Sequence, residues 1–205
     1  MKNAIYPLFP YPLMVCAKKY EFSSSEENFF SELELIENVG NSMSKNDMVL
    51  ESKELAGLKR FIDEQIFVFK QKLLRIKDDN EIYITQSWIN RSGSRDYHPK
   101  HKHPNSVISG VMFLDDNSDA SLPPIRFHRS YEMFPLDFDF AALNEFNASC
   151  REFDPEQGML MLFPSLLEHD VGKNLSDRVR SSLSFNTYVR GIVGGREQLT
   201  KVEIS

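Results

Sequence analysis

From residue 81 onward, the apolar residues of this chain recur every second position, and this pattern limits the folds available to it. Successive side chains of a β-strand point to opposite faces, so a period of two is typical of strands. Gly and Pro separate the alternating segments, as turns between strands require. The expected strands are EIYITQSWI, VISGVMFL, PIRFH, MLMLFP and RVRSSLSFNTY. Short strands in this number predict a β-sandwich or barrel.

Helical patterns occur only before residue 81. Ser24 and Glu27 form a capping box that predicts a helix start, and Gly40 predicts its end. A second helix is predicted by apolar residues at three- and four-residue steps. Its stripe consists of Leu55, Leu58, Ile62, Ile66, Phe69 and Leu73. Helices followed by strands indicate an α+β domain.

Composition narrows the class of protein. The 205 residues fit one domain, and 41% apolar with 26% charged residues is usual for a globular chain. The net charge of −6 comes without a Lys/Arg block, so no nucleic-acid partner is expected. Two cysteines are too few for a disulfide framework, and we expect free thiols. Without a signal-peptide pattern or a membrane-spanning apolar run, we expect a cytoplasmic protein with no membrane partner.

Three histidines form a candidate metal site. His101 and His103 are two residues apart, so in an extended strand both imidazoles project from one face. His169 can add a third imidazole from a distant segment. Two close ligands and one remote ligand hold a metal while leaving coordination positions open, as metal catalysis requires.

The strand after His169 carries an unusual polar face. Arg180, Ser182, Ser184 and Asn186 alternate with a more apolar set of residues. This arrangement predicts a polar interior pocket, with the apolar face packed beneath the helices. Arginine binds carboxylates through paired charge-assisted hydrogen bonds, so Arg180 is a candidate anchor for an acidic co-substrate. Arg178 is the competing anchor on the same face.

Several short motifs occur along the chain as a recognisable set. They are Ser87-Trp88-Ile89-Asn90, His101-Lys102-His103-Pro104, Ser109-Gly110, Leu162-Phe163-Pro164-Ser165, Arg180-Ser181-Ser182 and Ser184-Phe185-Asn186. With these motifs the chain resembles a family of small 2-oxoglutarate/Fe(II)-dependent oxygenases from marine bacteria and their phages. The resemblance covers most of the chain, including its early LFPYP.

The resemblance implies a fold and an activity. The expected fold is a double-stranded β-helix, or jelly roll, with N-terminal helices packed on one sheet. We therefore expect one domain over 1–205, with an extended segment and helices over 1–78 and the jelly-roll core over 79–205. The implied enzyme is a dioxygenase that uses Fe(II) and 2-oxoglutarate, with hydroxylation of an unactivated C–H bond as its outcome.

The resemblance also implies residue roles. His101, His103 and His169 are expected to hold Fe(II), with Arg180 and Ser182 on the far carboxylate of 2-oxoglutarate. Gln86 and Asn90 share a strand face and are further candidates for binding the co-substrate. Trp88, on that same face, is expected to belong to the core.

The chain departs from the broader superfamily at two positions. His103 stands where Asp or Glu is usual, which leaves the metal more positive. Asp96 is an alternative carboxylate ligand, whereas Glu168 and Asp170 flank His169 and are expected to point away from it. His98 is expected to be a pocket or surface residue, and His128 to be structural.

Other readings of the sequence stay open. A cupin-like dioxygenase with three-histidine iron would need no 2-oxoglutarate, and a catalytically silent jelly-roll binding protein would need no iron. The substrate, a small molecule or a protein, carries no recognisable code, and a homodimer is allowed. The irregular stretch Arg129–Gln157 is expected to be a lid or a long connection.

Overall fold

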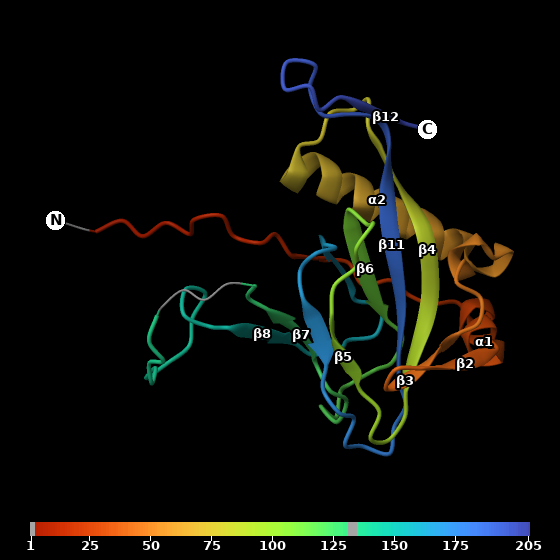
Figure 1. Ribbon diagram of the computed structural model, residues 1–205. Helices are drawn as coiled ribbons and strands as arrows, with labels where there is room; N and C mark the ends of the chain where they lie inside the picture. The colour runs from red at the N-terminus through yellow and green to blue at the C-terminus, as the bar shows by residue number, and fades with distance from the viewer. Residues whose placement is uncertain (1–2, 131–134) are drawn as a thin grey trace.

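Two β-sheets form the body of the protein. The computed structural model describes residues 3–130 and 135–205. Within them the strand order of the large sheet is β1-β9-β6-β11-β4-β3-β2, with β12 paired to β11, and the small sheet has the order β5-β10-β7-β8. Figure 1 shows β5, β7 and β8 to one side of β6 and β11. The large sheet comprises β1 (Met14–Val15), β2 (Leu35–Asn38), β3 (Asn41–Ser44), β4 (Glu81–Ser92), β6 (Ile108–Phe113), β9 (Leu160–Pro164), β11 (Arg180–Val193) and β12 (Val202–Ile204); the small sheet comprises β5 (His98–His101), β7 (Ile125–His128), β8 (Cys150–Phe153) and β10 (His169–Val171).

The predicted β architecture is confirmed, because each of the five alternating segments contains a strand. Alternation places the two faces of the large sheet in different surroundings. Val111 and Met161 pack in one buried cluster with Phe127 and Val171 of the small sheet. Their neighbours Met112 and Leu162 belong to a second cluster on the opposite face. Strands β6 and β9 are therefore apolar on both faces, and the molecule has two cores.

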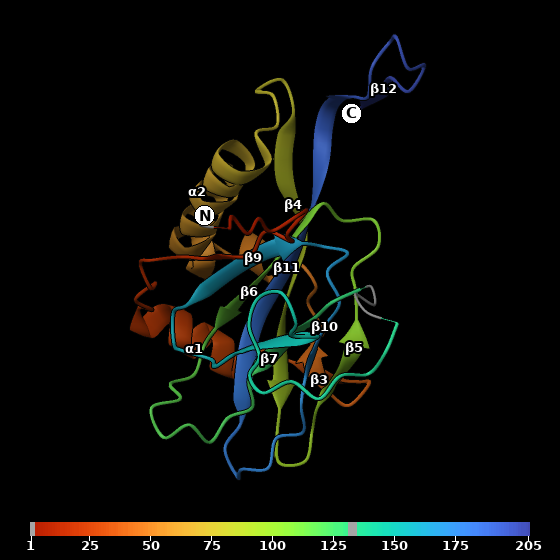
Figure 2. The same ribbon diagram turned by 90° about the vertical axis from the view of Figure 1, so that its left-hand side faces the viewer.

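The helices share the second cluster with the large sheet. They are α1 (Ser24–Glu32) and α2 (Ala56–Val68), the latter extended by a π-helical segment, Phe69–Leu74. Leu58, Ile62 and Ile66 of α2 are buried with Leu183 and Phe185 of β11. Figure 2 shows α1 and α2 on one side of β6 and β11, with β5 and β10 on the other. The predicted second helix is thus present, although its last residues form the π-helical segment.

The first helix differs from its prediction at both ends. Ser23, rather than Ser24, is the N-cap, and its capping box closes with Glu26. The helix ends at Glu32, and residues predicted to continue it form the hairpin of β2 and β3 instead. Gly40 has a φ of +81° in the hairpin turn, where a Cβ atom would lie 2.8 Å from the Tyr97 carbonyl oxygen. The prediction was wrong because this glycine serves a hairpin turn, which needs the same left-handed conformation as a helix C-cap.

Gly110 in β6 makes room for side chains that pack behind the site. A Cβ atom there would lie 2.2 Å from Phe185 Cζ and 2.8 Å from Leu162 Cδ2. Gly110→Ala is therefore expected to lower the free energy of unfolding by roughly 1–3 kcal/mol through overpacking. Urea denaturation measures this change. Gly93→Ala is the control, because its Cβ would meet only Asp96 Oδ2 at 3.6 Å; equal losses in both variants would contradict the packing argument.

The stretch 129–157 is only partly irregular. It contains β8, which pairs antiparallel with β7 and so extends the small sheet. Residues 131–134 of the stretch lie outside the described part. Between there and β8, the chain exposes Leu136, Phe138 and Leu143 by 66%, 48% and 69%. The least regular stretch of the sequence thus includes one strand, β8, where pairing with β7 satisfies the backbone.

The exposed segment 135–149 should be the first place at which a protease cuts the protein. Cleavage needs exposed backbone, and Leu136 and Leu143 lie at the surface. If the segment is a lid, Fe(II) together with 2-oxoglutarate should slow cleavage, since closure over the ligands protects it. Limited proteolysis with and without both ligands measures this. Equal rates would favour a purely structural role.

No helix in the described ranges has the length and apolar character needed to cross a membrane.

Candidate metal centre

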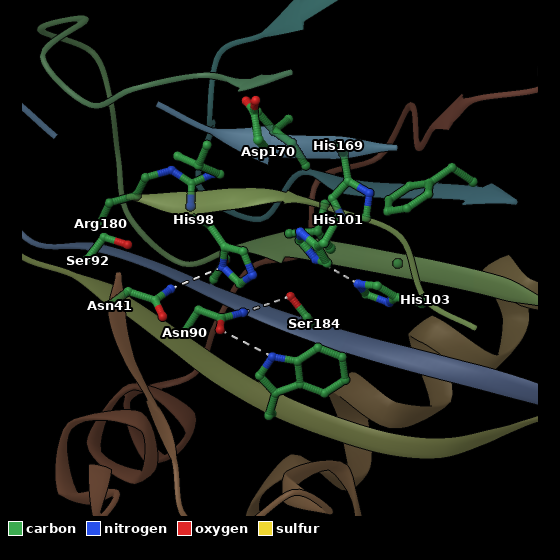
Figure 3. A pocket seen from close by; sticks show the side chains of 17 residues that line it. Asn41, Asn90, Ser92, His98, His101, His103, His169, Asp170, Arg180 and Ser184 are labelled. Atoms are coloured by element: carbon green, nitrogen blue, oxygen red, sulfur yellow. Dashed lines mark hydrogen bonds between the residues drawn. The ribbon is translucent and has the colours of Figure 1, made fainter. Parts of the chain in front are cut away.

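The three predicted histidines meet between the two sheets. His101 and His169 are direct partners in the β5–β10 ladder. His103 follows β5, and its backbone N–H donates to the Ser165 carbonyl at 2.8 Å. One ring nitrogen from each imidazole lies within 4.8 Å of the other two, and the Nε2 atoms of His101 and His103 are 3.0 Å apart. Figure 3 shows the three rings turned toward one another.

Hydrogen bonds at Nδ1 orient each ring. His101 Nδ1 lies 2.8 Å from the Pro99 carbonyl oxygen, and His169 Nδ1 lies 2.9 Å from that of Leu167. His103 Nδ1 lies 2.5 Å from Asn186 Oδ1. An oxygen of this kind only accepts, so all three Nδ1 atoms carry the proton. Each Nε2 therefore keeps its lone pair for a metal, with its ring already oriented.

Burial keeps the imidazoles neutral. It lowers the pKa of His169 to about 3, with a further lowering from His101. The pKa values of His101 and His103 are also lowered, and burial is again the main cause. Since only neutral imidazole ligates a metal, all three rings are competent ligands near pH 7.

Acidic side chains do not join this group within the described residues. The carboxylate of Asp170 binds Arg126 Nε at 2.5 Å and His128 Nε2 at 3.0 Å, and in Figure 3 it points away from the imidazoles. The predictions that Asp170 points away from His169 and that His128 is a structural residue are thus confirmed. Asp96 instead accepts a hydrogen bond from the Gly93 N–H at 2.8 Å and caps a turn.

Arg180 lies in the same cavity as the imidazoles, and its guanidinium group is only partly hydrogen-bonded. The side chain is only 4% exposed, its Nε donates to the Pro123 carbonyl at 3.1 Å, and its guanidinium carbon lies 5.3 Å from the centre of the Phe113 ring. The NH2 nitrogen is buried and has no hydrogen-bond partner among the residues that the structure describes. Burial lowers the pKa of Arg180 to about 10, so it stays cationic at neutral pH. An acidic ligand in the cavity would satisfy this group.

Arg178, the competing anchor, lies outside the cavity. Its guanidinium forms an ion pair with Asp119 at 2.6 Å, and its side chain is 39% exposed. The β11 strand begins only at Arg180, so the alternation that turns Arg180 inward does not extend to Arg178. The structure therefore separates the two arginines that the sequence left in competition.

The remaining predicted residues fall into two groups. Ser182 and Asn90 line the cavity, where Asn90 Nδ2 donates to Ser184 Oγ at 3.1 Å. Trp88 also lines it and donates from Nε1 to Asn90 Oδ1 at 3.2 Å, which corrects its expected place in the core. Gln86 is exposed and lies outside the cavity, because its register partner is Asn186, beyond the imidazoles.

A wider groove adjoins the cavity on the side of Gln86. Its volume is about 350 Å³. It shares Trp88, His98, His101 and His103 with the inner cavity, so these side chains separate the two spaces. A molecule in the groove would contact the imidazoles directly. Its lining is mostly polar or charged and includes Asn38, Asp47, Gln86, Lys102 and Asn186.

Comparison with known proteins identifies the family. Residues 86–186 match the family model described as "Putative 2OG-Fe(II) oxygenase". Residues 86–186 belong to this oxygenase family. The family is named for 2-oxoglutarate and Fe(II), the cofactors expected from the sequence. The matched residues include all three histidines, Arg180 and Ser182. No curated protein matches the chain.

Solved oxygenases share the fold at low sequence identity. HygX from Streptomyces hygroscopicus, with nickel, 2-oxoglutarate and hygromycin B bound, is 12% identical with a TM-score of 0.61, over 86% of this chain and 82% of its own. A prolyl-4-hydroxylase from Pseudomonas putida is 13% identical with a TM-score of 0.58, over 88% and 94%. A 2OG-Fe(II) oxygenase family protein from Burkholderia pseudomallei is 14% identical with a TM-score of 0.59, over 85% and 83%. These structures confirm an oxygenase fold of the jelly-roll type.

The site also involves residues to which the sequence analysis gave no role. Ser109 Oγ donates to Asn186 Oδ1 at 2.8 Å, so this pair positions the acceptor of His103. Both lie in motifs that were recognised, so a signal was present. Asn41 lines the cavity from the β2–β3 hairpin, outside the matched residues. Its position depends on pairing between β3 and β4, which no local pattern revealed.

Proposed function

We propose that this protein is an Fe(II)/2-oxoglutarate-dependent dioxygenase that hydroxylates a C–H bond of its substrate. One observation carries the proposal: three imidazoles with free Nε2 lone pairs share a cavity with a buried arginine whose NH2 group has no partner within 3–130 and 135–205. The first group suits a metal and the second suits a carboxylate. The family match supports the same pair of cofactors.

The donor atoms fit an octahedral metal. Two neighbouring ligands at right angles, each about 2.1 Å from a metal, lie about 3.0 Å apart. The Nε2 atoms of His101 and His103 have this separation. Three protein ligands on one side leave positions for a chelating co-substrate and oxygen. His101, His103 and His169 would therefore hold the iron.

The cavity also fits the far end of 2-oxoglutarate. Arg180 is buried, cationic and short of one hydrogen-bond acceptor. Ser182 is its neighbour on the inward face of β11 and lines the same cavity. Asn90 already bonds Trp88 and Ser184, so it supports the wall of the cavity. Arg180 and Ser182 would bind the far carboxylate, as proposed from the sequence.

The residues of the chain have distinct tasks in this reaction. When bound, iron and 2-oxoglutarate would let molecular oxygen act as the oxidant, so that oxidative decarboxylation of the co-substrate accompanies hydroxylation of the C–H bond. Asn186 and the Pro99 and Leu167 carbonyls hold the imidazoles in place. Arg180 orients the co-substrate by its charge. Apolar cavity residues such as Val111 and Phe163 limit water near the metal. The outer groove gives a substrate access to the imidazoles.

The three-histidine ligand set favours a second candidate. Neutral imidazoles without a carboxylate are also expected of a cupin-like dioxygenase that needs no 2-oxoglutarate. The unsatisfied Arg180 argues for the first candidate, because a co-substrate carboxylate accounts for it. HygX binds hygromycin B, whereas a prolyl hydroxylase from Trichoplax adhaerens binds a hypoxia inducible factor peptide. Such variety means that the fold alone does not determine the substrate.

An anaerobic titration tests the proposed function. Fe(II) should bind with one ion per chain, and 2-oxoglutarate added afterwards should produce a visible metal-to-ligand charge-transfer band. Iron binding without that band would favour the three-histidine dioxygenase. A protein that binds neither ligand would be a silent jelly-roll module.

A further inference from the structure

His98 is a fourth imidazole in the cavity, and its surroundings differ from those of the three proposed ligands. It is the first residue of β5, and its ring stacks on His101 with the ring centres 4.4 Å apart and an interplanar angle of 26°. In Figure 3 it lies between Asn41 and His101, close to the side chain of Arg180. His98 therefore lies beside the space between the metal centre and the carboxylate anchor.

Two asparagines of the hairpin fix where the proton of His98 resides. Asn38 Nδ2 donates to Asn41 Oδ1 at 3.0 Å, so the amide nitrogen of Asn41 is the atom turned toward His98. That nitrogen lies 3.1 Å from His98 Nδ1. An amide N–H only donates, so His98 Nδ1 must accept. The proton of the neutral ring is then on Nε2.

This tautomer is opposite to that of the proposed metal ligands. His101, His103 and His169 donate from Nδ1 and keep the Nε2 lone pair. His98 uses its Nδ1 lone pair for Asn41 and keeps an Nε2–H donor. Such a ring offers no lone pair to a metal, but it offers a hydrogen bond to an anion. Within the described residues, no acceptor is bonded to this Nε2, and Arg180 in the same cavity also lacks an acceptor.

We propose that His98 is a co-substrate-binding residue whose Nε2–H donates to a carboxylate of 2-oxoglutarate lying between the three histidines and Arg180. The inference rests on the proposed function and adds to it a specific donor. The hairpin takes part indirectly, since Asn38 and Asn41 hold the donor tautomer. His98 is thus a binding residue, and the two asparagines are positioning residues.

Two variants of His98 test the hydrogen bond. His98→Phe keeps a ring for stacking on His101 and removes the donor, whereas His98→Gln keeps an N–H donor. Isothermal titration of Mn(II)-loaded protein with 2-oxoglutarate should show binding weakened by about 10-fold or more in His98→Phe, as expected for a hydrogen bond to a charged group. His98→Gln should recover most of the affinity. His128→Gln is the matched control, because the His128 ring bonds Asp170 but does not itself line the cavity, so this change should leave affinity unchanged.

The metal affinity of each variant separates the possible outcomes. Mn(II) should bind His98→Phe as it binds the parent protein. Loss of metal binding in this variant would make His98 a ligand and overturn the inference, as would unchanged 2-oxoglutarate affinity. A parent protein that binds metal but no 2-oxoglutarate would instead refute the proposed function. Imidazole ¹⁵N chemical shifts of the protein without ligands should show an unprotonated Nδ1 at His98; a protonated Nδ1 would refute the asparagine argument separately.

Discussion

Replacing His101 or His169 by alanine is expected to abolish stoichiometric Fe(II) binding while the protein stays folded. Either change removes one of three converging Nε2 atoms, and two imidazoles alone hold the metal weakly. Neither side chain belongs to the two buried apolar clusters, so folding should not depend on them. Anaerobic equilibrium dialysis with iron analysis measures the loss, and circular dichroism verifies the fold. Two variants that bind iron like the parent would refute the ligand assignment.

His103→Asp provides a sharper test of the same site. Asp supplies the carboxylate that is usual in the superfamily at this position, so binding should survive although His101→Ala loses it. Survival would also show that the unusual imidazole is a substitution within a working ligand set. If His103→Asp also loses metal binding, the contacts of His103 with Asn186 and Ser109 are needed to position the ligand.

Replacing Arg180 by alanine is expected to raise the concentration of 2-oxoglutarate needed for half-saturation by roughly 100-fold or more. The effect is large because the ligand carboxylate would lose a buried cation and its hydrogen bonds. Metal affinity should be nearly unchanged, and calorimetric titration of metal-loaded protein measures both quantities. Arg180→Lys keeps the positive charge, so its affinity for 2-oxoglutarate should fall less. The difference between the two variants separates the contribution of the charge from that of the paired hydrogen bonds of a guanidinium group.

Arg178→Ala is the matched control for Arg180. Arg178 lies two residues away but pairs with Asp119 at the surface. Its removal should change 2-oxoglutarate affinity by less than about 2-fold, because exposed ion pairs contribute little. Equal effects of both substitutions, or an effect of Arg178→Ala alone, would reverse the assignment.

Sequence reasoning succeeded where a local pattern determines the structure. Alternation located the central strands. The spacing of His101 and His103 correctly predicted that their rings meet, although β5 ends at His101 and His103 lies just beyond the strand. The polar face of β11 was recognised for the same reason. The prediction that the first helix continues to Gly40 was wrong, because the apolar spacing of a short segment is compatible with both a helix and a hairpin.

The rest of the site depends on contacts between distant segments. The separation of Arg180 from Arg178 follows from where β11 enters the ladder with β4, which the sequence does not mark. The role of Asn41 follows from β3 pairing with β4, about fifty residues later in the chain. Gln86 was misplaced because a strand face continues past the cavity into the outer groove.

The edge position of the β2–β3 hairpin has an evolutionary consequence. The hairpin ends the strand order of the large sheet, and Asn41 at its turn reaches the cavity from outside the segment that defines the family. Edge hairpins tolerate insertion and exchange better than central strands, because only one neighbour must be matched. A change confined to this hairpin therefore alters the wall of the cavity while the segment that carries the three histidines and Arg180 stays the same.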